Sequence, residues 1–389
     1  MIRWLCFCAL AGCALPRPGA QRPAAPDALL IDAHADSTQD IVYRGYDFGK
    51  RHATNHEDLP RLREGGVSAQ IFSIFLEPRD FPPDRWFSEG EHQLLALREA
   101  LSRVPGMALA QTAQQVRDNR ARGQVSALFG IEGGHLLQPG TPDEQLAHLR
   151  RFAELGARYL TLTWSNSDDL GGSSGDAGRT QGLTDLGRRA ISEMERLGVV
   201  VDLSHVSDPL FWDAIRAARK PVIASHSSAR QLANVPRNLT DAQLEAVGKN
   251  GGAVCVNFFP AFLDQDVMRD FAAAEAALQA RFAQEKTPRD EQRRLEQEMA
   301  AGLRKVPLER VAEHIEHIAQ VAGIDHVCLG SDFDGIPMTP AGLEDASRLP
   351  ALSAALRQRG MSETDLHKLL GENLMRVLAA NEPSGDIPR

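Results

Sequence analysis

The sequence predicts an α/β protein built as a (β/α)8 TIM barrel. Short apolar runs recur eight times along the chain, segments with helical periodicity separate them, and no glycine-rich dinucleotide-binding motif accompanies the alternation. Near-continuous apolarity is typical of parallel strands that are covered on both faces. Eight strand–helix repeats favour closure into a barrel over an open doubly wound sheet. The 389 residues suit one such unit.

The apolar runs predict the strands in chain order. They span residues 28–31, 67–76, 126–131, 159–163, 199–203, 222–224, 253–259 and 327–330. Apolar residues spaced three and four apart predict helices over 145–154, 183–197, 208–218, 241–249 and 308–321.

Residues 264–305 interrupt this alternation after the seventh strand. The segment is long and charged, with Ala, Glu, Gln and Arg at helical spacing on both sides of Thr287 and Pro288. We expect a helical insertion folded as a hairpin. Its charge pattern indicates a solvated face; dimer contacts, giving a homodimer, or a lid over the site are the alternative interpretations.

Residues 1–26 are typical of an export leader followed by a tether. Arg3 precedes an apolar run over 4–11 that is too short to span a bilayer. The sequence Leu10-Ala11-Gly12-Cys13 resembles a bacterial lipoprotein cleavage box, which predicts a membrane anchor through a lipid on Cys13. Cleavage near Ala20 is the alternative and would leave a periplasmic or secreted protein. The C-terminal residues carry no apolar lipid-anchor signal, so any anchor is expected at the front.

Residues 27–389 are expected to form one folded domain, the barrel with its insertion. Its composition, 43% hydrophobic and 24% charged, is that of a globular protein with ample material for a core. A net charge of -9 excludes nucleic acid as the expected partner, because polyanion binding needs a concentrated basic surface. Outside the leader only Cys255 and Cys328 remain, and both are expected to be buried small hydrophobes rather than a disulfide.

Acidic and imidazole side chains stand where predicted strands one, three, five, six and eight end. Because the C-terminal ends of barrel strands share one rim, we expect these side chains to converge. Five of them are candidate metal ligands: His34, Asp36, Glu132, His205 and His226. Imidazoles combined with carboxylates favour zinc, with manganese or iron as alternatives.

Two ions are expected. His34, Asp36 and Glu132 would bind one, and Glu132, His205 and His226 the other, so that the two oxygens of Glu132 bridge the pair. Two adjacent ions can convert a shared water into a bridging hydroxide and polarise an amide carbonyl. Asp332 is expected to shuttle the proton from nucleophile to leaving amine, with Asp334 as the weaker candidate.

Other arrangements in the sequence have simpler interpretations. His314 and His317 are three apart on a predicted helix, but the charges beside them indicate a solvated face rather than a metal site. His52, His56 and His92 fall in loops and are expected to be solvated, with a place in the cleft as the alternative. Glu132 and Asp332 could form a glycosidase pair, a reading that leaves the histidines without a role.

The residues around these candidates resemble the renal (membrane) dipeptidase family. The similar motifs, in the same order, are 32–36 (DAHAD), 131–134 (IEGG), 202–207 (DLSHVS), 225–228 (SHSS) and 331–335 (SDFDG). The resemblance spans about residues 30 to 377. It implies an amidohydrolase-type barrel with two zinc ions that hydrolyses dipeptides with a free amine and a free carboxylate.

The resemblance also implies substrate-binding residues. Arg237 matches the family's Arg that grips the substrate carboxylate, and Asp332 matches the Asp beside the nucleophile and the substrate amine. Two positions depart from the family. Trp164 replaces a His that polarises the scissile carbonyl, and an indole N–H cannot carry a proton charge. Phe259 replaces a Tyr found in some members, which removes a hydroxyl.

The sequence therefore predicts a zinc dipeptidase of the cell envelope, whose substrates include dipeptides with a D-amino acid at the C-terminal position. Because Trp164 departs from the family, hydrolysis of another amide, an ester or a lactone on the same metal site is the second hypothesis. A barrel that binds peptides without catalysis is the third, and the complete set of candidate ligands argues against it.

Overall fold

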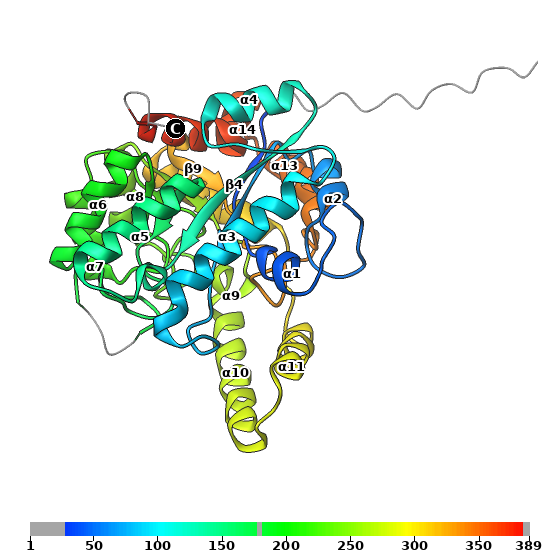
Figure 1. The fold of residues 1–389 in the computed structure, drawn as a ribbon. Helices are drawn as coiled ribbons and strands as arrows, with labels where there is room; N and C mark the ends of the chain where they lie inside the picture. Colours follow the sequence, from blue (N-terminus) through cyan, green and yellow to red (C-terminus); the bar gives the residue numbers. More distant parts are fainter. Residues whose placement is uncertain (1–27, 177–180, 384–389) are drawn as a thin grey trace, which may run out of the picture.

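A closed parallel barrel dominates the computed structural model, which describes residues 28–176 and 181–383 (Figure 1). Hydrogen bonding orders the strands β2-β1-β9-β8-β7-β6-β5-β4, and a further pairing of β2 with β4 closes the ring. The predicted (β/α)8 barrel is confirmed. Its eight strands are β1 (Ile31–Ala35), β2 (Ala69–Ile74), β4 (Val125–Glu132), β5 (Ala157–Thr161), β6 (Val200–Asp202), β7 (Ile223–Ala224), β8 (Ala253–Val256) and β9 (Val327–Leu329).

One strand was missed by the sequence analysis. β3 (Met107–Leu109) pairs in parallel with the first residues of β4, from Val125 to Ala127. β5 joins β4 only from Phe129 onward, so the start of β4 leaves an edge that β3 covers. The strand contains no β-branched or aromatic residue that would mark it in the sequence, and it lies at the opposite end of β4 from Glu132.

Capped helices cover the outside of the barrel. The five helices predicted there are α5 (Pro142–Leu155), α6 (Asp185–Leu197), α7 (Asp208–Ala217), α8 (Asp241–Asn250) and α12 (Glu309–Ala322). Thr141 and Thr240 form capping boxes that satisfy the first backbone N–H groups of α5 and α8. Gly156 and Gly251 end the same two helices in the left-handed conformation.

Further helices complete the layer around the barrel. They are α1 (Thr38–Tyr43), α2 (Leu59–Glu64), α3 (Trp86–Ser102), α4 (Ala113–Ala121), α9 (Pro260–Leu263), α13 (Leu349–Gln358), α14 (Glu363–His367) and α15 (Asn373–Asn381). A continuous apolar core lies between strands and helices, and a smaller cluster joins Leu128 and Tyr159 to Leu374 of α15. Burying these faces fixes the position of every strand end.

Cys255 and Cys328 form a disulfide, so the expectation of two free thiols was wrong. β8 and β9 are parallel neighbours, and their register places Cys255 directly opposite Cys328. The Cα atoms are 4.1 Å apart, and both side chains are buried. Strand order and register bring the two sulfurs together across 73 residues of chain, and neither can be derived from cysteine spacing.

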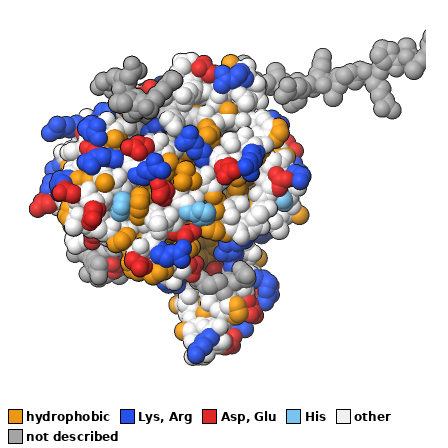
Figure 2. Space-filling view, viewed as in Figure 1, with side chains coloured by type: hydrophobic (Ala, Val, Ile, Leu, Met, Phe, Trp, Pro, Cys, Tyr) orange, Lys and Arg blue, Asp and Glu red, His pale blue; other side chains and the backbone are white. Residues whose placement is uncertain are grey.

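The helical hairpin predicted for 264–305 is present. α10 (Gln265–Glu285) and α11 (Arg289–Ala301) pack against each other and extend away from the barrel (Figure 1). Acidic and basic side chains lie among hydrophobic and other atoms on the visible surface of this protrusion in Figure 2, and ion pairs such as Arg294 with Glu298 lie along it. The base of the hairpin follows α9 and lies beside the rim of the barrel.

Among the described residues, no helix is long and apolar enough to cross a membrane. The predicted leader, the tether and Cys13 lie outside the described residues, as does the end of the chain from residue 384.

Candidate metal centre and active site

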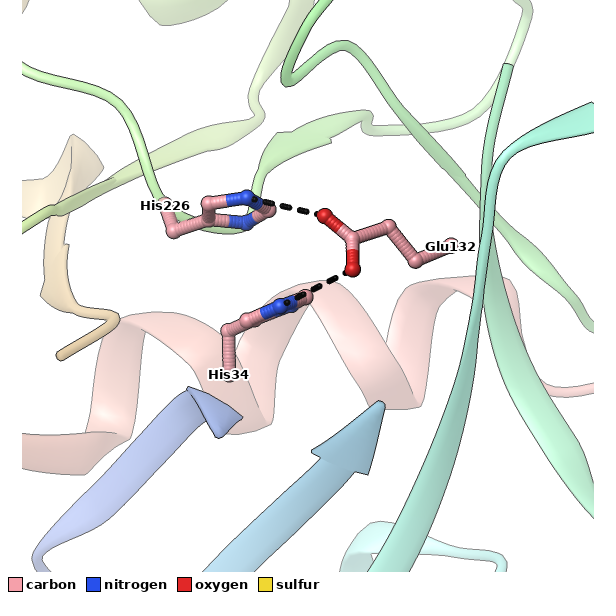
Figure 3. A group of neighbouring side chains, drawn as sticks. All are labelled: His34, Glu132 and His226. Atoms are coloured by element: carbon pink, nitrogen blue, oxygen red, sulfur yellow. Dashed lines mark ion pairs between the residues drawn. The ribbon is translucent and has the colours of Figure 1, made fainter. Parts of the chain in front are cut away.

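The five candidate ligands meet at the C-terminal rim of the barrel. His34 lies inside β1 and Asp36 follows it, because β1 runs further along the chain than predicted. Glu132 is the last residue of β4, while His205 and His226 follow β6 and β7. Figure 3 shows the Glu132 carboxylate between the rings of His34 and His226.

Glu132 is the centre of the cluster. Its Oε1 lies 3.0 Å from His205 Nε2 and 3.3 Å from His226 Nε2, and its Oε2 lies 3.5 Å from His34 Nε2. Asp36 Oδ2 is 3.7 Å from the same nitrogen of His34. The two oxygens of Glu132 therefore face different partners, which is the arrangement that a bridging carboxylate needs.

Two groups of side chains at this rim could each hold an ion. One consists of His34, Glu132 and His226, the other of His34, Asp36 and Asp332. His205 adds a further imidazole, 3.0 Å from His226 Nε2. The predicted division of ligands between two ions remains a prediction. In the structure, Asp332, which the sequence analysis assigned to neither ion, lies in one group with His34 and Asp36.

Hydrogen bonds at the back of the rings hold the imidazoles in place. Tyr159 Oη lies 2.7 Å from His34 Nδ1, and Ser225 Oγ lies 2.7 Å from His226 Nδ1. With Nδ1 engaged, the Nε2 atom of each ring faces Glu132. Such outer contacts orient metal-binding histidines and fix their tautomer.

Two buried aspartates organise the strand ends. Asp202 accepts from the backbone N–H groups of Ser204 and Ser225 and from the Ser225 hydroxyl. Asp32 accepts from the backbone N–H groups of His34 and Ser331. Both aspartates therefore fasten the turns that carry the site to neighbouring strands.

The backbone turns sharply at the rim. His205 and Asp332 have φ angles of 66° and 64°, in the left-handed region that side chains other than glycine rarely adopt. Such conformations cost on the order of 1 kcal/mol or more and persist where the surrounding structure enforces them. Gly335 is required beside them, because a Cβ there would lie 2.1 Å from Asp36 Oδ2 and 2.6 Å from Asp332 Oδ1.

The charges in this cluster favour a cation. Burial by itself lowers the pKa of His34, but Tyr159 and Glu132 together raise it well above its ordinary value. Burial raises the pKa of Glu132, but His34 and the other two imidazoles outweigh it and hold that pKa well below its ordinary value. The groups around His34 thus favour positive charge at this rim, as a bound cation would supply.

Asp332 has the properties of a proton-transfer group. Burial raises its pKa to about 7, with further upward contributions from Asp36 and Glu132. Asn257 Nδ2 donates to Asp332 Oδ2 at 2.9 Å and holds the carboxyl at the rim. A pKa near neutrality suits a group that both accepts and donates a proton.

The Asp334 carboxylate is hydrogen-bonded to residues outside the ligand cluster. It accepts hydrogen bonds from the Ser37 hydroxyl and from the backbone N–H of His56, both at 2.5 Å. The backbone N–H of Asp334 in turn donates to His56 Nδ1 at 2.9 Å. His56 therefore lines the active-site cavity in a fixed orientation, so the expectation of a solvated loop residue was wrong for it and the alternative, a place in the cleft, is correct.

The cavity above the ligands has a volume of about 1060 Å³ and is lined by all four predicted substrate residues, Arg237, Asp332, Trp164 and Phe259. Arg237 is 9% exposed and donates from Nη1 to Ser227 Oγ at 2.8 Å. Its Nε and Nη2 have no hydrogen-bond partner among the described residues. Burial lowers the pKa of Arg237 to about 10, which leaves it cationic at neutral pH and able to bind an anion.

Trp164 and Phe259 form apolar parts of the same cavity. The Trp164 ring packs against Phe75, with ring centroids 4.7 Å apart, and lies 6.4 Å from the ring of His205. Trp164 is thus close to the cluster, but it places an apolar ring where the resembling family has an ionisable one. The Phe259 ring contacts Phe262 of α9 and Phe271 of α10.

The helix histidines lie away from the site. His314 is fully buried. Its ring accepts a hydrogen bond from the Ala229 N–H through Nδ1, and its Nε2 lies 3.1 Å from the Leu263 carbonyl oxygen. The prediction of a solvated face was therefore wrong for His314. Only His317 reaches the surface, where it pairs with Asp241.

Several contributing residues were not predicted. Asp32 and Asp202 precede His34 and His205 by two and three positions, a spacing that could have marked them as organisers of the strand ends. Tyr159 carries no such signal, because its role depends on the pairing of β4 with β5 and on the space left by Gly130, whose Cβ would lie 2.0 Å from the Tyr159 ring.

The donor set fits a metal site. Three carboxylates and three imidazoles converge on one buried rim, a combination that suits zinc. His34 Nε2 and Asp36 Oδ1 are buried without a hydrogen-bond partner among the described residues, as ligand atoms are in a protein without its metal.

The family model for membrane dipeptidase, peptidase family M19, matches residues 22–385. The chain belongs to this family. Family M19 enzymes are metal-dependent, typically with zinc, so this protein is a metallo-dipeptidase that hydrolyses dipeptides.

Known relatives agree. The dipeptidase is 32% identical over 374 residues to an uncharacterized dipeptidase of Schizosaccharomyces pombe, covering 92% of this chain and 81% of the relative. It is similar to the crystal structure of dipeptidase AC, a family M19 metallo peptidase, with 29% identity, a TM-score of 0.75 and coverage of 92% and 99% of the two chains. A metallo peptidase from Rhodobacter sphaeroides, liganded with a phosphinate mimic of the dipeptide L-Ala-D-Ala, matches with 29% identity, a TM-score of 0.74 and coverage of 91% and 100%.

Proposed function

We propose that this dipeptidase binds two zinc ions at the Glu132 cluster and cleaves dipeptides held between Arg237 and Asp332. The observation that carries the proposal is that a bridging-type carboxylate surrounded by imidazoles and a buried Arg with two free nitrogens line one cavity. When two zinc ions are bound, they supply Lewis-acid activation of the attacking water as hydroxide and polarisation of the scissile carbonyl.

Arg237 fixes the orientation of the substrate. Its Nε and Nη2 would donate to the two oxygens of the substrate's C-terminal carboxylate. Acidic side chains line the same cavity, at Asp36 and Asp332, and favour the substrate's ammonium group. A dipeptide has these two charges at a fixed separation, so its peptide bond is placed over the ligand cluster.

Asp332 moves the proton. It would accept a proton from the nucleophile and donate it to the leaving amine, and Asn257 holds its carboxyl in place meanwhile. Trp164 offers an indole N–H and an apolar surface but no imidazolium, so the positive charge facing the oxyanion would come from metal ions held by the ligand cluster.

We further propose that a D-residue is accepted at the C-terminal position. The proposal is supported by the Rhodobacter sphaeroides relative, whose ligand mimics L-Ala-D-Ala. Arg237 would hold the C-terminal carboxylate, a group that substrates of either configuration carry.

Metal analysis combined with a substrate panel tests the function. We expect two equivalents of zinc per chain and hydrolysis of L-Ala-L-Ala and L-Ala-D-Ala by the zinc-loaded protein. L-alanyl-alaninamide, which lacks the carboxylate, should be cleaved at least about tenfold less efficiently. Arg237→Gln should abolish that difference by raising KM for the free dipeptide. Two bound metal ions without cleavage of any dipeptide would instead support hydrolysis of another amide, an ester or a lactone.

We also propose that the protein is exported and anchored by a lipid on Cys13. The leader pattern supports this, and so does the Cys255–Cys328 disulfide, because disulfides persist mainly in oxidising compartments. Metabolic labelling with a fatty acid should mark the wild-type protein and not Cys13→Ala. Release of unlabelled wild-type protein into the soluble fraction would favour cleavage near Ala20.

A further inference from the structure

The active-site cavity extends well beyond the metal ligands. It continues from Arg237 to the base of the hairpin, where three phenylalanines, Phe259, Phe262 and Phe271, form one surface that we name the aromatic wall. Phe259 precedes α9, Phe262 lies on α9 and Phe271 on α10. A dipeptide backbone held between Arg237 and Asp332 leaves this region free for a side chain.

The rings of the aromatic wall support one another. Phe259 contacts Phe262 edge to face with centroids 4.9 Å apart, and contacts Phe271 in the same manner at 5.1 Å. Phe259 is buried, whereas Phe262 and Phe271 are half-buried and expose part of each ring to the cavity. The geometry is that of a stable apolar surface, since edge-to-face pairs are favourable beyond their buried area.

Arg237 connects the wall to the substrate. Its guanidinium carbon stands 5.6 Å from the centroid of the Phe262 ring, and its free Nε and Nη2 are buried beside the same cavity. A carboxylate bound there places the α-carbon of the C-terminal residue next to the aromatic wall. The side chain on that carbon then has an apolar surface within reach.

We propose that the aromatic wall is the specificity site for the C-terminal residue of the dipeptide and selects bulky apolar side chains. The inference rests on the proposed binding of the substrate carboxylate by Arg237. It gives the hairpin a function in substrate selection, because Phe271 belongs to α10 and is absent without the insertion.

The apolar surface favours apolar side chains over charged ones. Met268 continues this surface, and charges of both signs, Glu275 and Glu296 with Arg79 and Arg293, line the same cavity. A C-terminal Asp or Glu side chain against the phenyl rings would lose its hydration without gaining a partner, whereas Leu or Phe would bury apolar surface there.

The test compares two substrates in each variant. For the zinc-loaded full-length protein we measure the ratio of kcat/KM for Ala-Phe to kcat/KM for Ala-Gly. We expect a ratio of at least about 10 in the wild type, since apolar groups in a pocket change specificity by factors of about 10 to 200. Phe271→Ala should reduce the ratio about tenfold, and Phe271→Leu should restore most of it. Ala-Asp should be hydrolysed less efficiently than Ala-Gly.

A matched variant distinguishes the loss of the Phe271 ring from general damage to the hairpin. Phe282 is also on α10 and buried, but it does not line the cavity. Phe282→Ala should keep the wild-type ratio. An unchanged ratio in Phe271→Ala, no preference in the wild type, or an equal loss in Phe282→Ala would each overturn the proposal. Failure of the wild type to cleave any dipeptide would refute the proposed function instead, so the two failures are distinguishable.

Discussion

Removal of the Cys255–Cys328 disulfide should destabilise the barrel substantially. The bond closes a loop of 73 residues. Loop-closure entropy for that length corresponds to about 4 kcal/mol at 25 °C, because the cross-link restricts the unfolded chain. The loop contains the whole α10–α11 hairpin, so the unfolded chain gains considerable freedom when the bond is absent.

Urea denaturation with and without a thiol reductant measures this contribution. We expect the free energy of unfolding of the wild type to fall by about 4 kcal/mol when the unfolded state is reduced. The double variant Cys255→Ala/Cys328→Ala should resemble the reduced wild type, with an additional loss of about 1 kcal/mol from the two vacated sulfur positions. Reductant should not affect the variant.

Two results would refute this reasoning. A reductant effect below about 1 kcal/mol would mean that the unfolded chain gains little from the broken bond. An effect of reductant on the double variant would mean that the change does not arise at this disulfide. A lower slope of unfolding free energy against urea in the oxidised protein is compatible with the argument, because the cross-linked unfolded chain exposes less surface.

Three further outcomes are expected. Glu132→Gln should bind less than one equivalent of zinc by elemental analysis, because the amide removes the charge shared by the imidazoles; full zinc content would contradict the bridging role. Tyr159→Phe should weaken zinc binding about 10- to 100-fold in chelator competition, since it removes the hydrogen bond to His34; equal affinity would show that the contact does not tune the ligand. Burial lowers the pKa of His314 from 6.5 to about 4. As pH falls from 6.5 towards 4, the unfolded state therefore binds a proton before the folded state does, and the free energy of unfolding decreases by at most about 3 kcal/mol. Urea midpoints of the wild type and His314→Gln across this range should converge at low pH, and parallel curves would exclude His314 as the cause.

Much of the architecture was predictable from local patterns. The eight barrel strands and the five helices from α5 to α12 follow apolar periodicity, and the hairpin follows a long segment of helix-forming residues. β3 was missed because its residues, Met107–Leu109, include no β-branched or aromatic side chain. His314 was misjudged because its neighbours in sequence are charged, whereas its ring points into the core and bonds two backbone groups.

The candidate ligands could be found for a similar reason. His34, Glu132, His205 and His226 stand at the ends of apolar runs, and the barrel rule places all such ends on one rim. The convergence of these ligands therefore follows from the fold class. The distances of 3.0 to 3.5 Å around Glu132 do not, since they depend on side-chain packing.

The sequence by itself determined the barrel, the catalytic rim and the chemical types of the donors, because these follow from periodicity and from position along each strand. Only the tertiary structure decided the Cys255–Cys328 bond, the contact of Tyr159 with His34 and the aromatic wall beside Arg237. Each of these joins residues from different strands or helices. Their proximity is set by strand register and by the packing of an inserted hairpin, which local sequence does not encode.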